Sequence, residues 1–365
     1  MLNLKKDAGL LVLILVVGAV VAIMNPRFLS SINIANTANL VGLFGIFAIG
    51  QAFVIITGGI ELSVGSMIAI LGVIFVDLIA NRGVPWPLAG LIVIVIGFVM
   101  GLIHGLLITK MRLQPFVVTL CGLLIYRGAA RFYTKDATAG FPFGANFPDL
   151  EWLTAGRTDF VSLVTGGGLH SIVLPHSFIF MLILAVVMWF VLHRSVFGRY
   201  LYAVGKNEEA ARFSGIRTTQ VIVAAYVICA VLTSIAAIYF AMYTRSILPS
   251  GHGNFYELYA IAAAVLGGFS LRGGEGSIVG VVLGVILLQI LQNLVNLLGI
   301  PSSLNFAVMG SVILIGVIAD NQFAKYRERR RQANMASSFS EEAGQAPAVA
   351  AMVRQPRRKA AGAQG

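Results

Sequence analysis

A polar, glycine-rich stretch separates two long apolar runs: Thr57-Gly58-Gly59-Ile60-Glu61-Leu62-Ser63-Val64-Gly65-Ser66. Non-helical backbone at membrane depth is tolerated only where protein buries it or where it lines a water-filled cavity. Broken helices of this kind are where transporters often place gates and binding sites. A second stretch, Leu266–Ser277, repeats the paired glycines, the acidic residue and the serine. The alternative is that both Gly-Gly pairs form tight turns at the cytoplasmic surface.

The composition on either side of these stretches is that of a membrane protein. Hydrophobic residues make up 58% of the 365 residues and charged residues only 11%. A helix that crosses the ~30 Å hydrocarbon layer needs about 20 mostly apolar residues. The predicted fold class is all-α, a polytopic membrane protein with about ten transmembrane helices. The predicted spans are 9–24, 40–57, 62–80, 87–109, 115–133, 174–192, 219–243, 258–270, 278–298 and 303–319.

The positions of lysine and arginine orient these spans. With a cytoplasmic N-terminus, fifteen of them fall on inner segments and the juxtamembrane tail and seven on outer segments, as the positive-inside rule expects. Both termini and the segment 194–218 are then cytoplasmic, and the loop 134–173 is periplasmic. The net charge of +11 reflects this topology and the tail, so no nucleic-acid partner is expected.

The two ends of the chain differ in character. Lys5 and Lys6 precede an apolar run that also suits a signal peptide, but no clean small-x-small cleavage site follows. We therefore expect a retained first span and a transmembrane permease domain over 1–320. The tail 321–365 is basic and is expected to be cytoplasmic and disordered. Its first part, Lys325–Arg331, would act as a membrane stop near anionic headgroups.

The chain lacks the usual sequence signs of catalysis. A phosphate-binding loop is missing, because Asn207 follows Gly205-Lys206 where Ser or Thr is required. No Ser/His/Asp set has a recognisable elbow, and no His/Cys cluster has zinc spacing, so neither a catalytic residue nor a metal is expected. Cys121 and Cys229 lie within predicted spans and are expected to be buried apolar fillers.

A polar segment, Gly198–Ile216, lies between two strongly apolar runs. Glu208 to Phe213 is predicted to form a short helix, with Asn207 as N-cap, acidic residues in its first turn and Gly215 at its C-cap. Such a helix could meet a soluble partner. The alternative is an ordinary solvated loop.

Glu61 is the most informative acidic residue. A carboxylate among apolar residues is unfavourable unless it is solvated, paired or protonated. It could accept a hydrogen bond from a sugar hydroxyl, pair with a cation, or cap the helix that begins near Leu62 together with Ser63. Glu275 poses the same question, and Arg272 is its expected local ion-pair partner.

Several amides also lie within predicted spans. Gln289, Gln292, Asn293 and Asn296 recur at three- and four-residue intervals and so share one helix face. That face either holds helices together or lines a passage.

Four motifs in order resemble the membrane-spanning permease subunit of bacterial ABC importers for monosaccharides, the ribose/xylose/galactose-type uptake family. The resemblance covers roughly residues 10–320. Its first motif is Gly58–Gly65, in which Glu61 stands where the family usually has Asp. This difference puts a close geometric role for the carboxylate in doubt. The other motifs are Gln114–Leu120, Gly198–Ile216, and Leu266–Gly280 with Asn296–Gly299.

The resemblance implies an assembly in the bacterial inner membrane. Two permease copies, or the chain and a homologue, would form the pathway for a monosaccharide or small polyol. A separate cytoplasmic ABC ATPase subunit would bind ATP and Mg, so this chain needs no cofactor and is not an enzyme. A periplasmic sugar-binding protein would deliver the substrate, and membrane lipid would surround the assembly.

The resemblance also assigns residues to roles. The ATPase-coupling residues would be Gly198, Ala203, Gly205, Asn207, Glu208, Glu209, Ala210, Ala211 and Gly215. The gating glycines would be Gly58, Gly59, Gly65, Gly267 and Gly268. Candidates for the substrate path are Gln51, Glu61, Ser63, Phe116, Thr119, Gln292, Asn293 and Asn296. Phe44 and Phe47 are, with Phe116, candidate aromatic faces for a sugar.

Two other functions remain open. A secondary transporter coupled to protons or ions would use Glu61 as its titrating site and would ignore ATP. A non-transporting scaffold would depend on the tail 332–365 and tolerate changes at Gly58–Gly65.

Overall fold

The computed structural model describes residues 4–159 and 173–301, with isolated positions 304, 307, 310, 311, 314 and 322. The chain divides into two compact units, Met1–Met309 and Gly310–Gly365, and every helix and strand named below belongs to the first. The expected tenth span and the expected disordered tail lie outside the described residues, apart from those isolated positions. The same holds for residues 160–172 of the predicted periplasmic loop.

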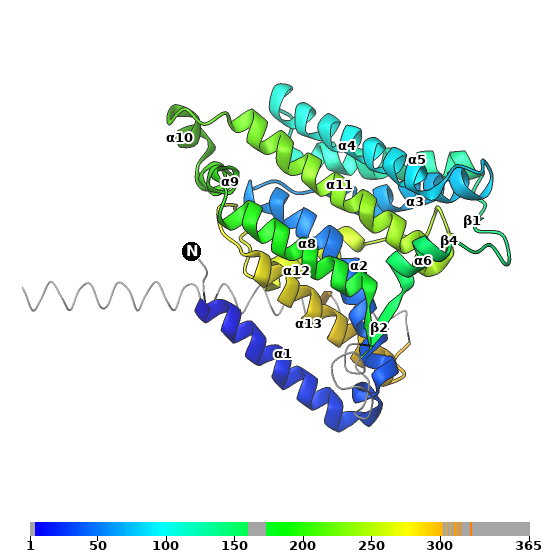
Figure 1. Cartoon of the computed structure of the whole chain (residues 1–365). Helices are drawn as coiled ribbons and strands as arrows, with labels where there is room; N and C mark the ends of the chain where they lie inside the picture. Colours follow the sequence, from blue (N-terminus) through cyan, green and yellow to red (C-terminus); the bar gives the residue numbers. More distant parts are fainter. Residues whose placement is uncertain are drawn as a thin grey trace, which may run out of the picture. The chain divides into compact units, whose positions relative to one another are not determined.

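Helices account for nearly all the described structure (Figure 1). Among the described residues, six helices are long and apolar enough to cross a membrane: α2 (Ser31–Ile56), α4 (Trp86–Lys110), α5 (Pro115–Thr134), α8 (His176–His193), α11 (Thr218–Thr244) and α13 (Ile278–Leu297). Three shorter helices are also apolar: α1 (Leu4–Met24), α3 (Val64–Ala80) and α12 (Tyr256–Leu266). The helical, multi-pass fold class is confirmed, and nine predicted spans coincide with helices. The count of ten and the cytoplasmic termini stay predictions.

Two predicted boundaries are wrong for local reasons. α2 begins at Ser31 rather than at residue 40, because the Ser30 side chain accepts a hydrogen bond from the Asn33 amide and caps the helix. α12 ends at Leu266 rather than at residue 270, since Gly268 has a φ of +89° and cannot continue a right-handed helix.

Hydropathy gave no signal for the short elements. They are the 3-10 helix η1 (Pro26–Leu29), the helices α6 (Pro148–Ala155), α9 (Val196–Lys206) and α10 (Glu208–Phe213), and the strands β1 (Ala139–Gly140), β2 (Arg157–Asp159), β3 (Val173–Pro175) and β4 (Ser246–Ile247). β1 pairs antiparallel with β4, and β2 with β3. These ladders lie at the end of the unit opposite α9 and α10 (Figure 1). We call the two ends the ladder end and the α10 end.

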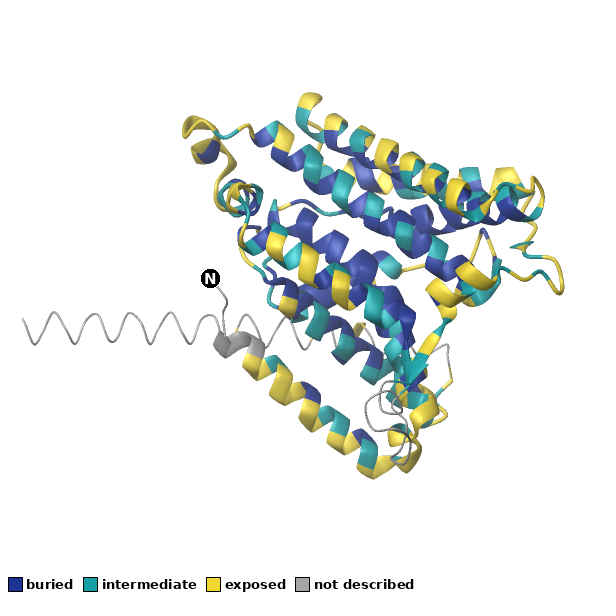
Figure 2. Cartoon of the chain, viewed as in Figure 1, coloured by how far each residue is buried: buried dark blue, intermediate teal, exposed yellow. Residues whose placement is uncertain are grey.

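The core forms around α2. Every residue from Val41 to Ile56 is buried, and α2 packs against α8, α11, α12 and α13. α4, α5 and α8 expose most of their apolar surface (Figure 2), which fits helices that face lipid. Cys229 is buried in α11, but Cys121 is exposed on α5. The expectation of two buried thiols is therefore wrong for Cys121, because α5 buries only one narrow stripe.

One arrangement occurs twice along the chain. A long helix, a non-helical break and a short helix follow one another in α2, 57–63 and α3, and again in α11, 245–255 and α12. α2 and α11 pack together and run in opposite directions (Figure 1). Both short helices begin inside the protein, because Ser63 is fully buried and Glu257 is almost fully buried.

Candidate functional site

The predicted coupling segment folds as two helices at the α10 end. α10 spans Glu208–Phe213, and the Asn207 side chain accepts a hydrogen bond from the Ala210 amide at 2.9 Å. Gly215 follows with a φ of +83°. The predicted helix and its N-cap are confirmed, and Gly215 directly follows the C-cap residue, Ser214. Glu208, Glu209 and Ala210 are exposed while Ala211 is buried, so α10 presents one face outward.

Two features of this segment were not predicted. The Phe213 ring is 84% exposed at the end of α10, and exposed aromatic rings are common anchors of protein interfaces. The preceding residues, Val196–Lys206, form α9, which is capped by Ser195 through the Gly198 amide at 3.0 Å. Its amphipathic pattern was the available signal, since Leu201 and Val204 face inward while Ala203 is half-buried.

α9 is fastened to the segment that precedes α13. The Tyr202 hydroxyl donates to the carbonyl of Gly276 at 2.7 Å and lies 3.3 Å from His193 Nδ1. His193 Nε2 in turn accepts from the Ile278 amide at 3.4 Å. Burial raises the pKa of Tyr202 far above its ordinary value, so this hydroxyl stays protonated and keeps donating at physiological pH.

The C-terminal end of α9 meets both glycine-rich stretches. The Gly274 amide donates to the carbonyl of Ile56, the last residue of α2, at 2.8 Å. A Cβ on Gly205 would overlap both of these backbones, and Gly273 packs against Gly58. We call Gly58, Gly205, Gly273 and Gly274 the glycine junction. Only residues without a side chain allow α9, the end of α2 and the loop 266–277 to pack backbone against backbone.

An ion pair beside this junction corrects the expected partner of Glu275. Lys206 Nζ lies 2.5 Å from Glu275 Oε1, with both side chains about 60% exposed. The expectation of Arg272 as a local partner is wrong, because the folded loop brings Glu275 to the end of α9. Such an exposed pair contributes little stability.

The predicted gating glycines lie at helix ends: Gly58 and Gly59 after α2, Gly65 in the first turn of α3, and Gly267 and Gly268 after α12. Gly58, with a φ of +81°, closes a turn at the end of α2. Gly59, Gly65 and Gly267 have no room for a Cβ, since their nearest neighbours are the Tyr226 hydroxyl and the carbonyls of Gly253 and Gly280. A tight turn at 57–59 is followed by non-helical backbone at 60–63, where Glu61 and Ser63 are buried. A gate at this stretch stays a prediction.

Glu61 is held by three donors inside the protein. Its Oε1 accepts from the Ser63 amide at 2.8 Å and from the Ser63 hydroxyl at 2.6 Å. Its Oε2 lies 2.8 Å from His104 Nδ1, which donates to it, and the Tyr126 hydroxyl lies 2.9 Å from His104 Nε2. The Glu61 and His104 side chains are only 3% and 2% exposed. The sequence analysis missed His104 and Tyr126, whose one signal was their polarity within apolar helices.

The remaining path candidates do not gather at one place. Thr119 is buried on α5 and donates to the carbonyl of Ile60 at 3.2 Å, so it supports the first break. Phe116 is 52% exposed on α5. Gln51 is buried on α2, and its Nε2 has no partner among the described residues. Its Oε1 lies 3.8 Å from Cys229 Sγ.

The amide face of α13 serves partly to hold helices together. Asn293 and Asn33 exchange two side-chain hydrogen bonds, at 3.1 and 2.8 Å. Asn296 is exposed, and Gln292 is half-buried with an Oε1 that has no partner in the described part of the chain. A passage along this face stays a prediction for these two residues.

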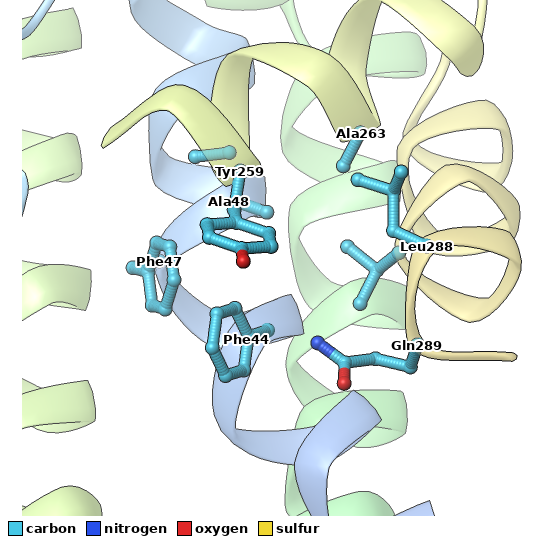
Figure 3. Close-up of a pocket in the computed structure, with 9 residues that line it drawn as sticks. Phe44, Phe47, Ala48, Tyr259, Ala263, Leu288 and Gln289 are labelled. Carbon is cyan, nitrogen blue, oxygen red and sulfur yellow. The ribbon is translucent and has the colours of Figure 1, made fainter. Parts of the chain in front are cut away.

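A small cavity of about 10 Å³ lies between α2, α12 and α13. Figure 3 shows the rings of Phe44, Phe47 and Tyr259 near the Gln289 amide. Gln289 is buried, and its Oε1 has no partner among the described residues. Two of the three candidate aromatic faces thus meet here, while Phe116 does not. The volume suffices for about one water molecule, so a sugar cannot occupy this cavity in the present conformation.

A larger groove of about 510 Å³ opens at the α10 end. One wall is α10 and the start of α11, and the other is formed by the ends of α2 and α4 and the start of α5. Its polar lining includes Thr57, Thr109, Arg112, Glu208, Glu209, Arg212, Thr218 and Thr219. The coupling segment and the first break therefore border the same space.

Comparison with known proteins identifies the kind of molecule that carries this site. Residues 33–317 match the family described as the permease component of branched-chain amino acid transport systems. The chain belongs to this permease family. The permease is 39% identical over 322 residues to the ribose import permease protein RbsC of Bacillus subtilis (strain 168), covering 88% of this chain and 94% of that protein.

Further relatives are permeases for sugars. The ribose import permease protein RbsC of Escherichia coli (strain K12) is 35% identical over 312 residues, which cover 86% of this chain and 92% of that protein. The xylose transport system permease protein XylH of the same organism is 29% identical over 367 residues, with 87% and 93% covered. No solved structure matches the permease. The resemblance drawn from four motifs is confirmed: the permease is a multi-pass membrane protein of the sugar ABC importer family, whose members are transporter components.

Proposed function

We propose that the permease is the membrane-spanning subunit of an ATP-binding cassette importer that carries a monosaccharide or small polyol across the bacterial inner membrane. A second copy or a homologue completes the translocation path. A separate cytoplasmic ATPase binds ATP and Mg and drives the cycle, and a periplasmic sugar-binding protein delivers the substrate. Lipid is its other partner, and nucleic acid is not. The family and its sugar-permease relatives support this proposal.

The proposed coupling mechanism rests on the backbone packing at the glycine junction. The exposed face of α10 offers Glu208, Glu209 and Phe213 to a cytoplasmic partner. α10 follows α9, and the end of α9 packs on the backbone of α2 and of the loop 266–277 through Gly205. Close-packed backbone moves as a unit rather than yielding gradually. A partner that shifts α10 therefore shifts both glycine-rich stretches, and with them the helices they join.

Substrate affinity is assigned to the binding protein, and the permease supplies a weakly polar path. The family description names branched-chain amino acids, which makes them the second candidate substrate class. An amino acid brings one negative and one positive charge, and a site for it needs a charged partner for each. Glu61, the acidic candidate on the path, already accepts from Ser63 and His104. A neutral polyhydroxylated substrate makes no such demand.

The test is co-purification and uptake with α10 altered. Permease with its partner subunits is solubilised in mild detergent as wild type, Ala210→Arg and Gly215→Pro. Arginine blocks the exposed face of α10, and proline cannot adopt the φ of +83° at Gly215. Both variants are expected to insert normally, to lose the ATPase and to stop taking up labelled ribose or xylose.

Phe143→Ser serves as the control, because Phe143 is exposed on the loop near β1, away from α10. It should keep the ATPase and uptake. Normal uptake by both α10 variants would refute the coupling assignment. Uptake of leucine rather than sugar would move the permease to the second substrate class, and transport that ignores ATP would favour the ion-coupled alternative at Glu61.

A further inference from the structure

α5 is an outer helix that nevertheless reaches into the centre of the permease. Most of its apolar surface is exposed, yet the adjacent residues Tyr126 and Arg127 are half-buried. Their polar atoms bond at two different places, each beside the start of one of the two short helices. The coupling path proposed above, from α10 through the glycine junction, does not include Tyr126 or Arg127.

Tyr126 leads to the start of α3. Its ring lies against the His104 ring, with centroids 5.6 Å apart and planes inclined by 23°. Its hydroxyl is 2.9 Å from His104 Nε2, and His104 Nδ1 is 2.8 Å from Glu61. Glu61 in turn binds the amide and hydroxyl of Ser63, directly before α3. The first connection therefore runs from α5 through α4 to the first break.

Arg127 leads to the start of α12. Its Nη1 donates to the carbonyl of Pro249 at 2.8 Å and to that of His252 at 2.7 Å. Backbone carbonyls outside regular structure need other hydrogen-bond donors when they are shielded from water, and the Arg127 guanidinium supplies one to each of these two carbonyls.

The two places that α5 reaches are in contact with each other. A Cβ on Gly65, in the first turn of α3, would overlap the Gly253 carbonyl and come within 2.7 Å of Glu257 Oε2. A Cβ on Gly253 would overlap the Gly65 carbonyl in the same way. The starts of α3 and α12 thus form one packed body, and neither can shift without the other.

We propose that Tyr126 and Arg127 are positioning residues that make the starts of α3 and α12 move together with α5 during transport. The inference rests on the proposed function. α5 contacts the first break a second time, through Thr119, and its first residue, Pro115, lines the groove that α10 borders. α5 therefore joins the α10 end to the interior, and its adjacent polar side chains distribute one displacement to both breaks.

The experiment uses the complete complex with its ATPase and binding protein in proteoliposomes, and labelled ribose or xylose as substrate. Uptake, basal ATP hydrolysis and the hydrolysis stimulated by loaded binding protein are measured for wild type, Arg127→Gln, Arg127→Lys and Tyr126→Phe. Arg131→Gln is the matched control, since Arg131 lies on the same helix and, among the described residues, its guanidinium pairs only with exposed Asp136.

Arg127→Gln is expected to lower uptake about tenfold or more, because two partly buried carbonyls lose a charged donor. The complex should still assemble and hydrolyse ATP at the basal rate, while stimulation by loaded binding protein is lost. Arg127→Lys retains the charge and should restore part of the uptake. Tyr126→Phe keeps the ring but not the hydroxyl and should lower uptake several-fold, about the effect of one neutral hydrogen bond. Arg131→Gln should match wild type.

Two results would overturn the inference while leaving the proposed function intact. One is wild-type uptake by both Arg127→Gln and Tyr126→Phe. The other is a loss of uptake that follows thermal stability, assembly and basal hydrolysis together, which a merely structural role predicts. Wild-type permease that binds no ATPase and moves no sugar would instead overturn the proposed function, and the inference with it.

Discussion

The two breaks, 57–63 before α3 and 245–255 before α12, satisfy the hydrogen-bonding groups of their backbones in different ways. At the first break, Glu61 accepts from the backbone and hydroxyl of Ser63, and the Ile60 carbonyl accepts from Thr119 and Tyr226. At the second, Arg127 supplies one donor group to two carbonyls. At the first break the Ile60 carbonyl has two donors, whereas at the second the Pro249 and His252 carbonyls share one cation, and Thr244 and Asn254 bond other carbonyls of that segment. Redundancy should therefore make the first break more tolerant of single changes.

The largest loss of stability is expected where the starts of α3 and α12 contact each other, at Gly65 and Gly253. Gly65→Val places a branched side chain on the Gly253 carbonyl, and forcing atoms into a packed interior costs about 1–3 kcal/mol or more. We expect little folded, monodisperse protein in detergent by fluorescence-detected size exclusion. Gly128→Ala is the control, because Gly128 is helical and has open space around it; it should elute as wild type. A normal profile for Gly65→Val would show that the two helix starts do not pack.

The next largest loss of stability is expected at Glu61, where two substitutions separate the effect of the side chain's charge from that of its length. Glu61→Leu leaves the Ser63 amide, its hydroxyl and His104 without their shared acceptor, which costs about 1–3 kcal/mol. Glu61→Asp keeps the charge but is one methylene shorter, so we expect it to keep one of the two contacts and lose about 1 kcal/mol. Melting temperatures in detergent should therefore fall in the order wild type, Asp, Leu. Equal melting temperatures for all three would mean that Glu61 holds nothing in place.

A smaller loss of stability is expected when one of the two donors to the Ile60 carbonyl is removed. Thr119→Val removes one donor to the Ile60 carbonyl, while Tyr226 still donates at 3.4 Å. We expect a loss of about 0.5–1.5 kcal/mol with uptake retained. Thr134→Val on the same helix is the control, because in the described part of the chain the Thr134 hydroxyl bonds only to carbonyls of α5. If Thr119→Val stops transport entirely, the first break has no spare support and the contrast with the second disappears.

The smallest effect is expected outside both breaks. Lys206→Gln removes the exposed pair with Glu275 beside the glycine junction, and exposed pairs contribute about 0–1 kcal/mol. Uptake should change less than twofold at low salt, and the difference should vanish at about 0.5 M salt, where screening is strong. A large, salt-independent loss would show that the pair itself carries the coupling motion. Glu275→Gln should behave alike.

Local signals in the sequence predicted much of this architecture. The nine described spans follow from apolar runs, and α10 follows from Asn207, two acidic residues and Gly215, because a helix cap depends on neighbours a few residues away. α9 was missed because it is amphipathic rather than apolar throughout. The beginning of α2 was misplaced, since hydropathy does not register a cap such as Ser30.

The partners of the candidate residues could not be predicted in the same way. Glu61 and His104 are 43 residues apart, and Tyr126 is a further 22 along the chain, so their meeting depends on how α4 and α5 rotate about their axes. Arg272 was predicted as the ion-pair partner of Glu275 because it is near in sequence. The fold instead brings Lys206 to Glu275. Conversely, the candidate path residues were chosen because polar or aromatic side chains suit a sugar, and they do not share a place, as Phe116 on the outer face of α5 shows.

The bare ring of Phe213 has a consequence for biosynthesis. A permease made in excess of its partners carries an uncovered aromatic side chain at the tip of α10, the kind of surface that chaperones and proteases recognise. If the ATPase covers this ring, we expect surplus chains to have shorter lifetimes in the cell than assembled ones. Expression of the permease alone will yield less protein than expression alongside the partner that covers this ring.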